Sequence, residues 1–441
     1  MLFGRLMGQE TEYAIRFSPE RSHPGNDRIY GFLAQAIGRH VRTEPGFYPA
    51  RPQIFMQNGG GFHYEYRPHR AADGLIEGAT PECRGPAQLL LYQKAQEALL
   101  MKVIPAAETS LGEQGFPGKL GLLKNCRDAR GNVYGAQESF QVCVASGLSL
   151  VAYRVGLAAL MPLLALTVAI GWVVMLVALV ALAVAVAGGV VVALPPFRRR
   201  RWLERLMDFE ENTVKRGLGR MREATTWPFF AGLWLVVRCC AFRKVRRSAM
   251  AFFVSRAAFS GAGSVEEDGR FSLSEKGAAI NTILRLSMSP RERPIFDTGN
   301  LMRAAFAAAH FHFDPVVNLF ARKQRLQLGL ADSSMLEEAE FLKMGTTALV
   351  VDMAEAGFLS EAPYPLDPVA ALHTLVSDPA LEAVVNTNRG ELTALALQRF
   401  YLDKANAFVK ESKATSLEAS VTTDFKLANG FLLASKLFAT K

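Results

Sequence analysis

The chain carries glutamates in a pattern that suits metal and phosphate chemistry. In the stretch GQETEYAI, Glu10 and Glu12 alternate with other residues, several of them aromatic or β-branched, which predicts a strand. Side chains on a strand repeat their direction every second residue, so both carboxylates point to one face. Such a pair can hold Mg²⁺, which prefers oxygen ligands and shares them with phosphates. The alternative is a strand face that is merely solvated.

Further carboxylates lie in segments that the same alternation predicts as strands. NGGGFHYEY and IEGATPEC carry Glu65, Glu77 and Glu82 on either side of a loop. Farther along, AQESFQVCV follows a turn at DARGN, and its period of two places Glu138 and Phe140 on one face. These strands must lie in one sheet before their carboxylates can form a site.

A long apolar run interrupts these segments. From Val155 to Phe197 there is no charged residue, and a helix of that length measures about 64 Å at 1.5 Å per residue. A bilayer core is about 30 Å thick. We therefore expect a transmembrane hairpin with spans at about 152–171 and 173–195, and Trp172 at the far interface, where indoles are favoured. The alternative is an apolar hairpin buried in a soluble core.

The basic residues around this run predict its orientation. Arg154 and the cluster Arg198–Arg201 flank the two spans on one side, which the positive-inside rule makes cytoplasmic. An even number of spans then leaves both termini and the catalytic domain in the cytoplasm, with the protein at the cell membrane. The stretch Trp227–Phe242 is short for a span and is predicted as an in-plane helix.

The net charge of +9 has a local origin. Between Arg154 and Arg247 there are 15 basic and 5 acidic residues, and the remainder of the chain holds 35 and 36. The basic excess thus belongs to the membrane-flanking region, so we expect membrane lipid as its partner and no nucleic acid.

These observations predict four parts of the chain. They are an N-terminal part of a catalytic domain (1–150), an inserted membrane region (151–247, with the hairpin at about 152–195 and juxtamembrane and interfacial helices at 198–247), a C-terminal part of the catalytic domain (248–410) and a short C-terminal tail (411–441).

Several motifs, taken in order, resemble those of a known family. GQETEYAI, NGGGFHYEY with IEGATPEC, and LLKNCRDARGNVYGAQESF precede the apolar run, and FFVSRAAFSGAGSV, RPIFDTGN and RLQLGLADSS follow it. Together they resemble the Pup ligase and depupylase family, the proteasome accessory factor A group, over about 1–150 and 250–405. The resemblance implies an α+β, glutamine-synthetase-like fold, in which a curved antiparallel sheet with helices on one face holds ATP and Mg²⁺.

The resemblance also implies an activity. A ligase of this family activates the C-terminal glutamate of a small protein modifier with ATP, and a lysine of a target protein attacks it to form an isopeptide bond. The depupylase branch hydrolyses such a bond or the corresponding amide. The expected partners are therefore a Pup-like modifier and its target proteins. The sequence leaves the choice between ligase and depupylase open.

The family motifs assign roles to particular residues. Glu10, Glu77 and Glu138 match glutamates that hold the metal, so they are the implied metal ligands. The implied nucleotide contacts are Glu12 and Lys276, of which Lys276 stands in place of an arginine. Counting forward from NG places the catalytic carboxylate at Glu65, whereas counting back from Glu77 points near Asp73, and both stay open.

The sequence also departs from the family pattern. IEG and QESF stand where the family has H-P-E-Y and H-E-N-Y, Gly299 stands where an arginine is expected, and Gln327 replaces a histidine. These departures support an alternative, in which the protein binds nucleotide without turnover and serves as a scaffold or regulator at the membrane.

Overall fold

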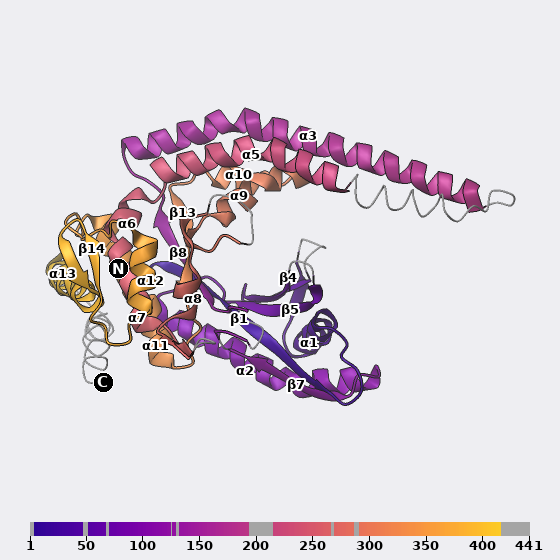
Figure 1. The fold of residues 1–441 in the computed structure, drawn as a ribbon, viewed down its shortest axis with the longest axis horizontal. Coiled ribbons are helices and arrows are strands. Elements are labelled where there is room, and N and C mark those ends of the chain that lie inside the picture. Colours follow the sequence, from indigo (N-terminus) through magenta and orange to yellow (C-terminus); the bar gives the residue numbers. More distant parts are fainter. Residues whose placement is uncertain are drawn as a thin grey trace.

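One large sheet forms the centre of the protein in this computed structural model (Figure 1). The structure describes residues 4–46, 52–67, 70–124, 126–128, 132–193, 215–265, 269–285 and 291–415. The sheet has eleven strands in the order β11–β12–β13–β8–β1–β5–β4–β3–β2, with β6 and β7 also paired to β1. They are β1 (Leu6–Pro19), β2 (Thr43–Pro45), β3 (Gln53–Met56), β4 (Gly61–Arg67), β5 (Arg70–Ala79), β6 (Cys83–Arg84), β7 (Gly118–Leu123), β8 (Ala136–Cys143), β11 (Thr282–Leu284), β12 (Pro294–Asp297) and β13 (Lys323–Ala331).

The strand directions correct one detail of the predicted fold. β11 and β12 run parallel, whereas the other described pairs of this sheet are antiparallel. The α+β class is confirmed, and the sheet is mixed instead of wholly antiparallel. The pairing of β8 with β13, in which Phe140 lies opposite Leu326, joins strands from both sides of the apolar run in one sheet.

Helices α1, α2, α7 and α11 pack on the sheet face opposite to the predicted metal ligands Glu10 and Glu77, whereas α8 and the end of α10 approach the face of these ligands. Met7 of β1 and Phe140 of β8 belong to a core with α7 and α11, while Tyr13 of β1 packs with α1 and α2. The helices are α1 (Asn26–His40), α2 (Pro86–Glu113), α3 (Leu148–Ala193), α5 (Lys215–Cys239), α6 (Arg243–Ser248), α7 (Met250–Ser260), α8 (Glu275–Ala279), α9 (Gly299–Phe306), α10 (Asp314–Asn318), α11 (Glu337–Ala356), α12 (Pro368–Val376) and α13 (Ala394–Thr415), with a 3₁₀ turn η2 (Ala307–His310). Two short hairpins, β9 (Ser264–Val265) with β10 (Phe271–Ser272) and β14 (Val384–Thr387) with β15 (Gly390–Thr393), complete the described elements.

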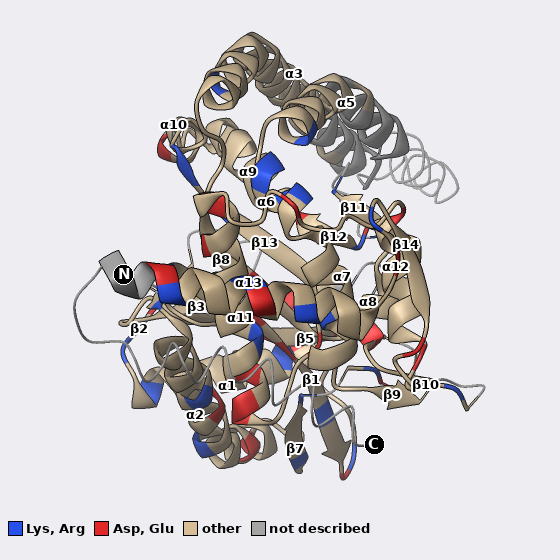
Figure 2. Ribbon diagram, turned by 90° about the vertical axis from the view of Figure 1, so that its left-hand side faces the viewer, with Lys and Arg blue, Asp and Glu red and all other residues tan. Residues whose placement is uncertain are grey.

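Helices α3 and α5 form an antiparallel pair, called the arm below, that extends beyond the sheet (Figure 1). Two glycines let the helices approach closely. A Cβ on Gly156 of α3 would lie 2.8 Å from Val236, and one on Gly232 of α5 would lie 2.5 Å from Leu160. Figure 2 shows α3 almost entirely free of charged positions.

The predicted turn at Trp172 is wrong. Helix α3 runs without a break from Leu148 to Ala193, through the whole of the first predicted span and most of the second. A single glycine, Gly171, precedes Trp172, and one glycine costs a helix only about 1 kcal/mol relative to alanine. The apolar helix-forming residues on both sides outweigh that cost, so the chain continues as one helix.

Helix α3 also contacts the rest of the protein near both ends of the first predicted span. The Tyr153 hydroxyl donates to the Leu319 carbonyl at 3.1 Å, the Arg154 Nε donates to the Phe320 carbonyl at 3.0 Å, and the Trp172 ring lies 5.5 Å from the Phe311 ring. A segment that crosses a bilayer would have lipid at these positions. The transmembrane hairpin is therefore not supported in its predicted form.

One described helix is nevertheless long and apolar enough to cross a membrane. The stretch Leu148–Val177 has a mean hydropathy of 2.5, and 11% of its most apolar window is buried. Length and composition alone do not establish a span, because core helices of soluble proteins pass the same criterion. The predicted in-plane helix at Trp227–Phe242 is mostly part of α5. The cluster Arg198–Arg201 and most of the tail 411–441 lie outside the described residues.

Candidate functional site: a carboxylate face of the sheet

Strand register brings most of the predicted site residues to one face. Glu12 of β1 lies opposite Glu77 of β5, and Glu77 lies opposite His63 of β4. Residues directly opposite each other point to the same face, and so do residues two apart on one strand. Glu10 and Glu65 therefore share this face. We call it the carboxylate face, formed by Glu10, Glu12, His63, Glu65 and Glu77.

Three of these carboxylates have a basic partner from a different part of the fold. Glu10 forms an ion pair with Arg325 of β13 (2.7 Å), and Glu12 forms one with Lys276 of α8 (3.4 Å), while the His63 Nε2 of β4 lies 2.6 Å from the Glu77 carboxyl. The Gly135 backbone N–H also donates to Glu12 at 2.8 Å. The face thus holds four carboxylates against two permanent cations and one histidine.

This imbalance of charge shifts the pKa values of the carboxyl groups. Burial raises the pKa of Glu77 well above its usual range, and repulsion from Glu10 and Glu12 raises it further. Glu65 lies at the open side of the face and is exposed, yet the protein around its carboxyl removes part of its solvation, and this together with repulsion from Glu77 and Glu12 raises the pKa of Glu65 to about 7. Burial also opposes ionisation of Glu10, but Arg325 outweighs it and the pKa of Glu10 falls below its usual value. Shifted carboxyl pKa values on an open sheet face mark a candidate catalytic site.

A cavity of about 690 Å³ opens beside these residues. Glu10, His63 and Arg325 line its polar part, and Asn318 and Ala321 close it from the segment at the end of α10. Its volume is in the range of small-molecule sites. A small molecule can therefore reach Glu10 from solvent.

Glu138 does not join this face, which corrects the implied ligand set. In β8, Glu138 pairs in register with Gln9 of β1, so it points to the opposite face of the sheet. There it is fully buried and forms an ion pair with Arg256 of α7 at 2.9 Å. The neighbouring Gln137 pairs with Glu10 and takes the place on the carboxylate face that Glu138 was expected to hold.

The two candidates for the catalytic carboxylate lie at different places. Glu65 lies opposite Leu75. This pair is two residues along the strands from the His63–Glu77 pair, so the two pairs are neighbours on the same face. Asp73 lies four residues from Glu77 on β5, about 13 Å along the strand at 3.3 Å per residue. Glu77 and Glu12 act electrostatically on Glu65. Position on the sheet therefore separates Glu65 from Asp73, which the sequence could not do.

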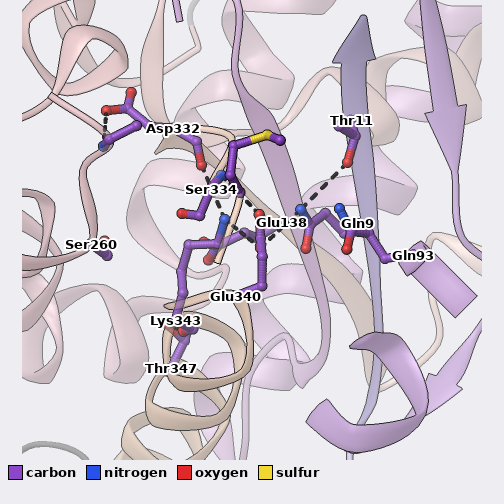
Figure 3. Close-up of polar contacts among 12 residues, drawn as sticks. Gln9, Thr11, Gln93, Glu138, Ser260, Asp332, Ser334, Glu340, Lys343 and Thr347 are labelled. Atoms are coloured by element: carbon purple, nitrogen blue, oxygen red, sulfur yellow. Dashed lines mark hydrogen bonds and ion pairs between the residues drawn. The ribbon is translucent and has the colours of Figure 1, made fainter. Parts of the chain in front are cut away.

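A buried polar network positions Lys276. The backbone N–H of Lys276 donates to Asp332 at 2.8 Å, and that of Ala262, in the glycine-rich loop after α7, donates to the same carboxylate at 3.0 Å. Figure 3 shows Asp332 close to Lys343, whose ammonium donates to the Asp332 carbonyl and pairs with Glu340 at 2.7 Å. This network fixes the segment that carries Lys276 against the sheet.

The donor set fits Mg²⁺ in its chemistry. Glu10, Glu12 and Glu77 offer carboxylate oxygens on adjacent strands, and their mutual repulsion is what a bound divalent cation would relieve. Among the residues that the structure describes, no group of three or more His, Cys, Asp or Glu side chains is arranged as a ready metal site. Binding would require these carboxylates to turn from their present ion-pair partners.

Comparison with known proteins identifies the family. Residues 5–428 match the family described as Pup-ligase protein. The chain belongs to the Pup-ligase protein family. Two relatives are the Pup–protein ligase of Pseudarthrobacter chlorophenolicus, 22% identical over 93% of this chain and 64% of that protein, and the depupylase of Acidothermus cellulolyticus, 34% identical over 42% of this chain and 35% of that protein.

Solved structures of other Pup-ligase family members share the fold. The complex of the prokaryotic ubiquitin-like protein Pup with its ligase PafA matches 99% of this chain and 65% of that chain, with a TM-score of 0.60 and 18% identity. PafA in complex with ADP matches 95% of this chain with a TM-score of 0.54, also at 18% identity. The chain spans slightly less than two thirds of the length of the relatives that match it along most of its sequence.

Sequence reasoning missed several residues of the site in this Pup-ligase family member. His63 and Arg325 were not singled out, although each lies two residues from one that was, Glu65 and Gln327 respectively. Alternation on the strands would have found them. Asp332 carried no such signal, because its role depends on contacts with a loop far away in the sequence.

Proposed function

We propose that this protein carries out ATP-dependent amide chemistry on the C-terminal Glu or Gln of a small Pup-like protein. The observation that carries the proposal is the crowding of four carboxylates on one sheet face beside an open cavity, with a Glu65 pKa of about 7. Membership of the Pup-ligase protein family supports the substrate class. The matching structures hold PafA in complex with Pup and with ADP, which supports a Pup-like partner and ATP here.

In this proposal one group of residues on and around the carboxylate face binds the metal and the phosphates, and Glu65 transfers the proton. Glu10 and Glu77, with Glu12 beside them, hold Mg²⁺, and Arg325 and Lys276 neutralise phosphate oxygens. When bound, Mg-ATP supplies the phosphoryl group for activation of a carboxylate and spreads its charge. Glu65 is the general base, because a carboxyl with a pKa near 7 is partly ionised at neutral pH and can still accept a proton effectively.

The base works in either direction of amide chemistry. In ligation, Glu65 removes a proton from the attacking lysine ammonium. In hydrolysis, it removes a proton from the attacking water. We propose Glu65 for this role over Asp73 because Glu65 lies closer along the face to Glu77. The turnover assay described below distinguishes ligase activity from depupylase activity.

A second candidate is a nucleotide-binding scaffold without turnover. The position of Gln137 favours it, because an amide stands on the carboxylate face at the place expected for a metal carboxylate. With Glu138 on the other face, the site has one ligand fewer than the family resemblance implied. Such a site could retain nucleotide and lose the chemistry.

We further propose that the arm holds the protein at the cytoplasmic surface of the cell membrane. The outward side of α3 exposes apolar residues over several turns, among them Val151, Val155, Leu166, Val173 and Leu176. An apolar surface that continues over several turns of an exposed helix is uncommon on free soluble proteins. Because Tyr153 and Trp172 contact the body, we propose that α3 lies in the membrane interface and does not span the bilayer.

An assay of turnover tests the catalytic proposal. The purified protein is incubated with ATP, Mg²⁺ and a Pup-like protein ending in Glu or Gln, and mass spectrometry follows amide gain, loss or transfer. We expect turnover by the wild type and a loss of about 10²–10⁴-fold in Glu65→Gln, with Mg-ATP binding nearly unchanged. Asp73→Asn is the matched control and should remain active. Mg-ATP binding without any turnover in the wild type would favour the scaffold.

Vesicle flotation tests the membrane proposal. Val151→Asn/Val155→Asn places two polar groups on the outward face of α3 and should release the protein from vesicles. Leu91→Asn/Met101→Asn, at exposed apolar positions of α2, which lies away from the arm (Figure 1), should bind as the wild type does. Equal binding by both pairs would exclude the arm as the contact.

A further inference from the structure

A second site lies at the base of the arm, where α5 turns into α6. Two cavities of about 840 and 410 Å³ share Arg243, Arg247 and Tyr364 in their walls. Lys244 completes the basic wall of the larger cavity, and Arg238 that of the smaller one. We call the two cavities together the basic basin.

The basin has an excess of positive charge that the protein does not neutralise. Within the described part of the chain, no carboxylate forms an ion pair with Arg238, Arg243, Lys244, Arg246 or Arg247. The sequence agrees, since no acidic residue occurs from 224 to 265. Burial, together with repulsion from Arg238 and Arg243, lowers the pKa of Arg246. A bound anion would relieve this repulsion.

Arg246 and Lys244 already have backbone partners, Lys244 donating to the Glu355 carbonyl at 2.7 Å, and Arg238, Arg243 and Arg247 are available. Arg246 donates to the carbonyls of Val237, Arg238 and Ala241, and so closes the end of α5. Arg238 lies 5.0 Å from the ring of Trp234. Arg243 and Arg247 are exposed and have no hydrogen bond among the described residues, so they can turn toward a ligand. Figure 2 shows Lys and Arg positions gathered around α6.

The surroundings of the basin indicate what kind of anion it takes. Ser149, Ser248, Ser360 and Tyr364 add hydroxyl groups to the walls, which suits phosphate oxygens. Exposed apolar residues of both arm helices border the basin, since Leu148 of α3, 88% exposed, adjoins Ser149 in the wall, and Leu235 of α5, 56% exposed, lies about one turn before Arg238. A phosphate group next to an apolar surface is the arrangement that a phospholipid presents at the membrane interface.

We propose that the basic basin binds the phosphate headgroup of an anionic phospholipid while the acyl chains lie on the arm. This inference rests on the membrane association proposed above and does not depend on the catalytic proposal. The basin would set the height of the carboxylate face above the membrane. Soluble phosphate esters share the headgroup chemistry, so the test separates the two sources.

Removal of two free charges tests the basin. Arg243→Gln/Arg247→Gln keeps Arg246 and its helix-closing contacts, so the fold should be retained, and circular dichroism and thermal melting verify this. Arg39→Gln/Arg399→Gln removes the same charge at exposed positions elsewhere. The probes are phosphatidylcholine vesicles with and without phosphatidylglycerol, and soluble glycerol 1-phosphate followed by the fluorescence of Trp234.

We expect the basin variant, Arg243→Gln/Arg247→Gln, to bind phosphatidylglycerol vesicles about 30-fold more weakly than the wild type, because each basic residue contributes roughly fivefold to the affinity. The affinity of the Arg39→Gln/Arg399→Gln control should stay within about twofold of the wild-type value. Residual binding of the basin variant should still exceed that to pure phosphatidylcholine, because Arg238 and Lys244 remain, and its turnover of a soluble Pup-like substrate should be unchanged. Equal vesicle binding by the basin variant and the control would overturn the headgroup site and leave membrane association through α3 intact. Binding of glycerol 1-phosphate by the basin without any effect on vesicles would overturn the lipid assignment.

Discussion

The two faces of the sheet use the same residue type in opposite ways. On the carboxylate face, Glu77 and Glu65 lie among other carboxylates, and their pKa values are raised. On the opposite face, Glu138 is paired with Arg256. Glu340 of α11 packs below that face, where burial opposes its ionisation but Lys343 and Lys124 outweigh it, and its pKa is lowered.

The difference separates residues that fold the protein from residues available for chemistry. A buried glutamate with a matched cation is fully occupied, and removal of either partner leaves an uncompensated buried charge that destabilises the native state. A glutamate that faces other carboxylates is held at a cost in stability, which is characteristic of sites that bind a cation or move a proton. The predictions below test this comparison from the largest expected effect to the smallest.

Loss of the buried ion pair should have the largest effect. Glu138→Ala leaves the Arg256 charge buried without a partner, and the free energy of unfolding should fall by about 3–5 kcal/mol. Chemical denaturation measures this. Glu391→Ala, at an exposed glutamate, is the control and should change stability by less than about 0.5 kcal/mol. The double variant Glu138→Leu/Arg256→Met should recover most of the loss, and a loss as large as that of the single variant would contradict the ion-pair account.

The sequence predicted part of the carboxylate face and misplaced the buried face. A period of two placed Glu10 and Glu12 together and the family motifs singled out Glu65 and Glu77, whereas the register that brings all four together comes from the structure. Glu138 was misplaced because the family motif was followed where the alternation was the better guide. In β8, Glu138 shares its face with buried Phe140, which already indicated the core.

Other features depended on contacts that no local pattern contains. Arg325 reaches Glu10 only because β13 pairs with β8, and Asp332 holds Lys276 from a distant strand end. The straight course of α3 past Trp172 reflects packing on α5 through Gly156 and on Phe311. A hydropathy pattern alone could not distinguish this long helix from two short spans.

A small change beside Glu12 should have an intermediate effect. Gly135→Ala would place a Cβ 2.7 Å from the Ala331 carbonyl and 2.9 Å from the Lys276 side chain. The backbone must move, so the free energy of unfolding should fall by about 1–3 kcal/mol, and Lys276 should lose its contact with Glu12. Mg-ATP binding measured by calorimetry should weaken with it. Unchanged stability and unchanged binding together would show that this close approach is not needed.

The pH dependence of stability should reveal Glu65 with the smallest effect, since this side chain is exposed. Its folded-state pKa of about 7 lies above the unfolded value of 4.5, so ionisation costs more in the folded state. The wild type should therefore lose stability as the pH rises from about 4.5 to 7, and Glu65→Gln should lose less. The two proteins should melt together near pH 4, and the variant should melt higher near pH 8. Glu82→Gln, at an exposed glutamate beside the same cavity, should follow the wild type at both pH values.

A paired measurement on Glu77→Gln and Glu138→Gln tests the central claim most directly. Each variant is titrated with Mg-ATP by calorimetry and unfolded by denaturant near pH 8, at a temperature where both are folded. The account predicts that Glu77→Gln loses most of its Mg-ATP affinity while keeping at least the stability of the wild type, because it removes a repelled charge. It predicts that Glu138→Gln loses stability and binds Mg-ATP as the wild type does. Loss of Mg-ATP binding by folded Glu138→Gln, with full binding by Glu77→Gln, would contradict the assignment of the site to the carboxylate face.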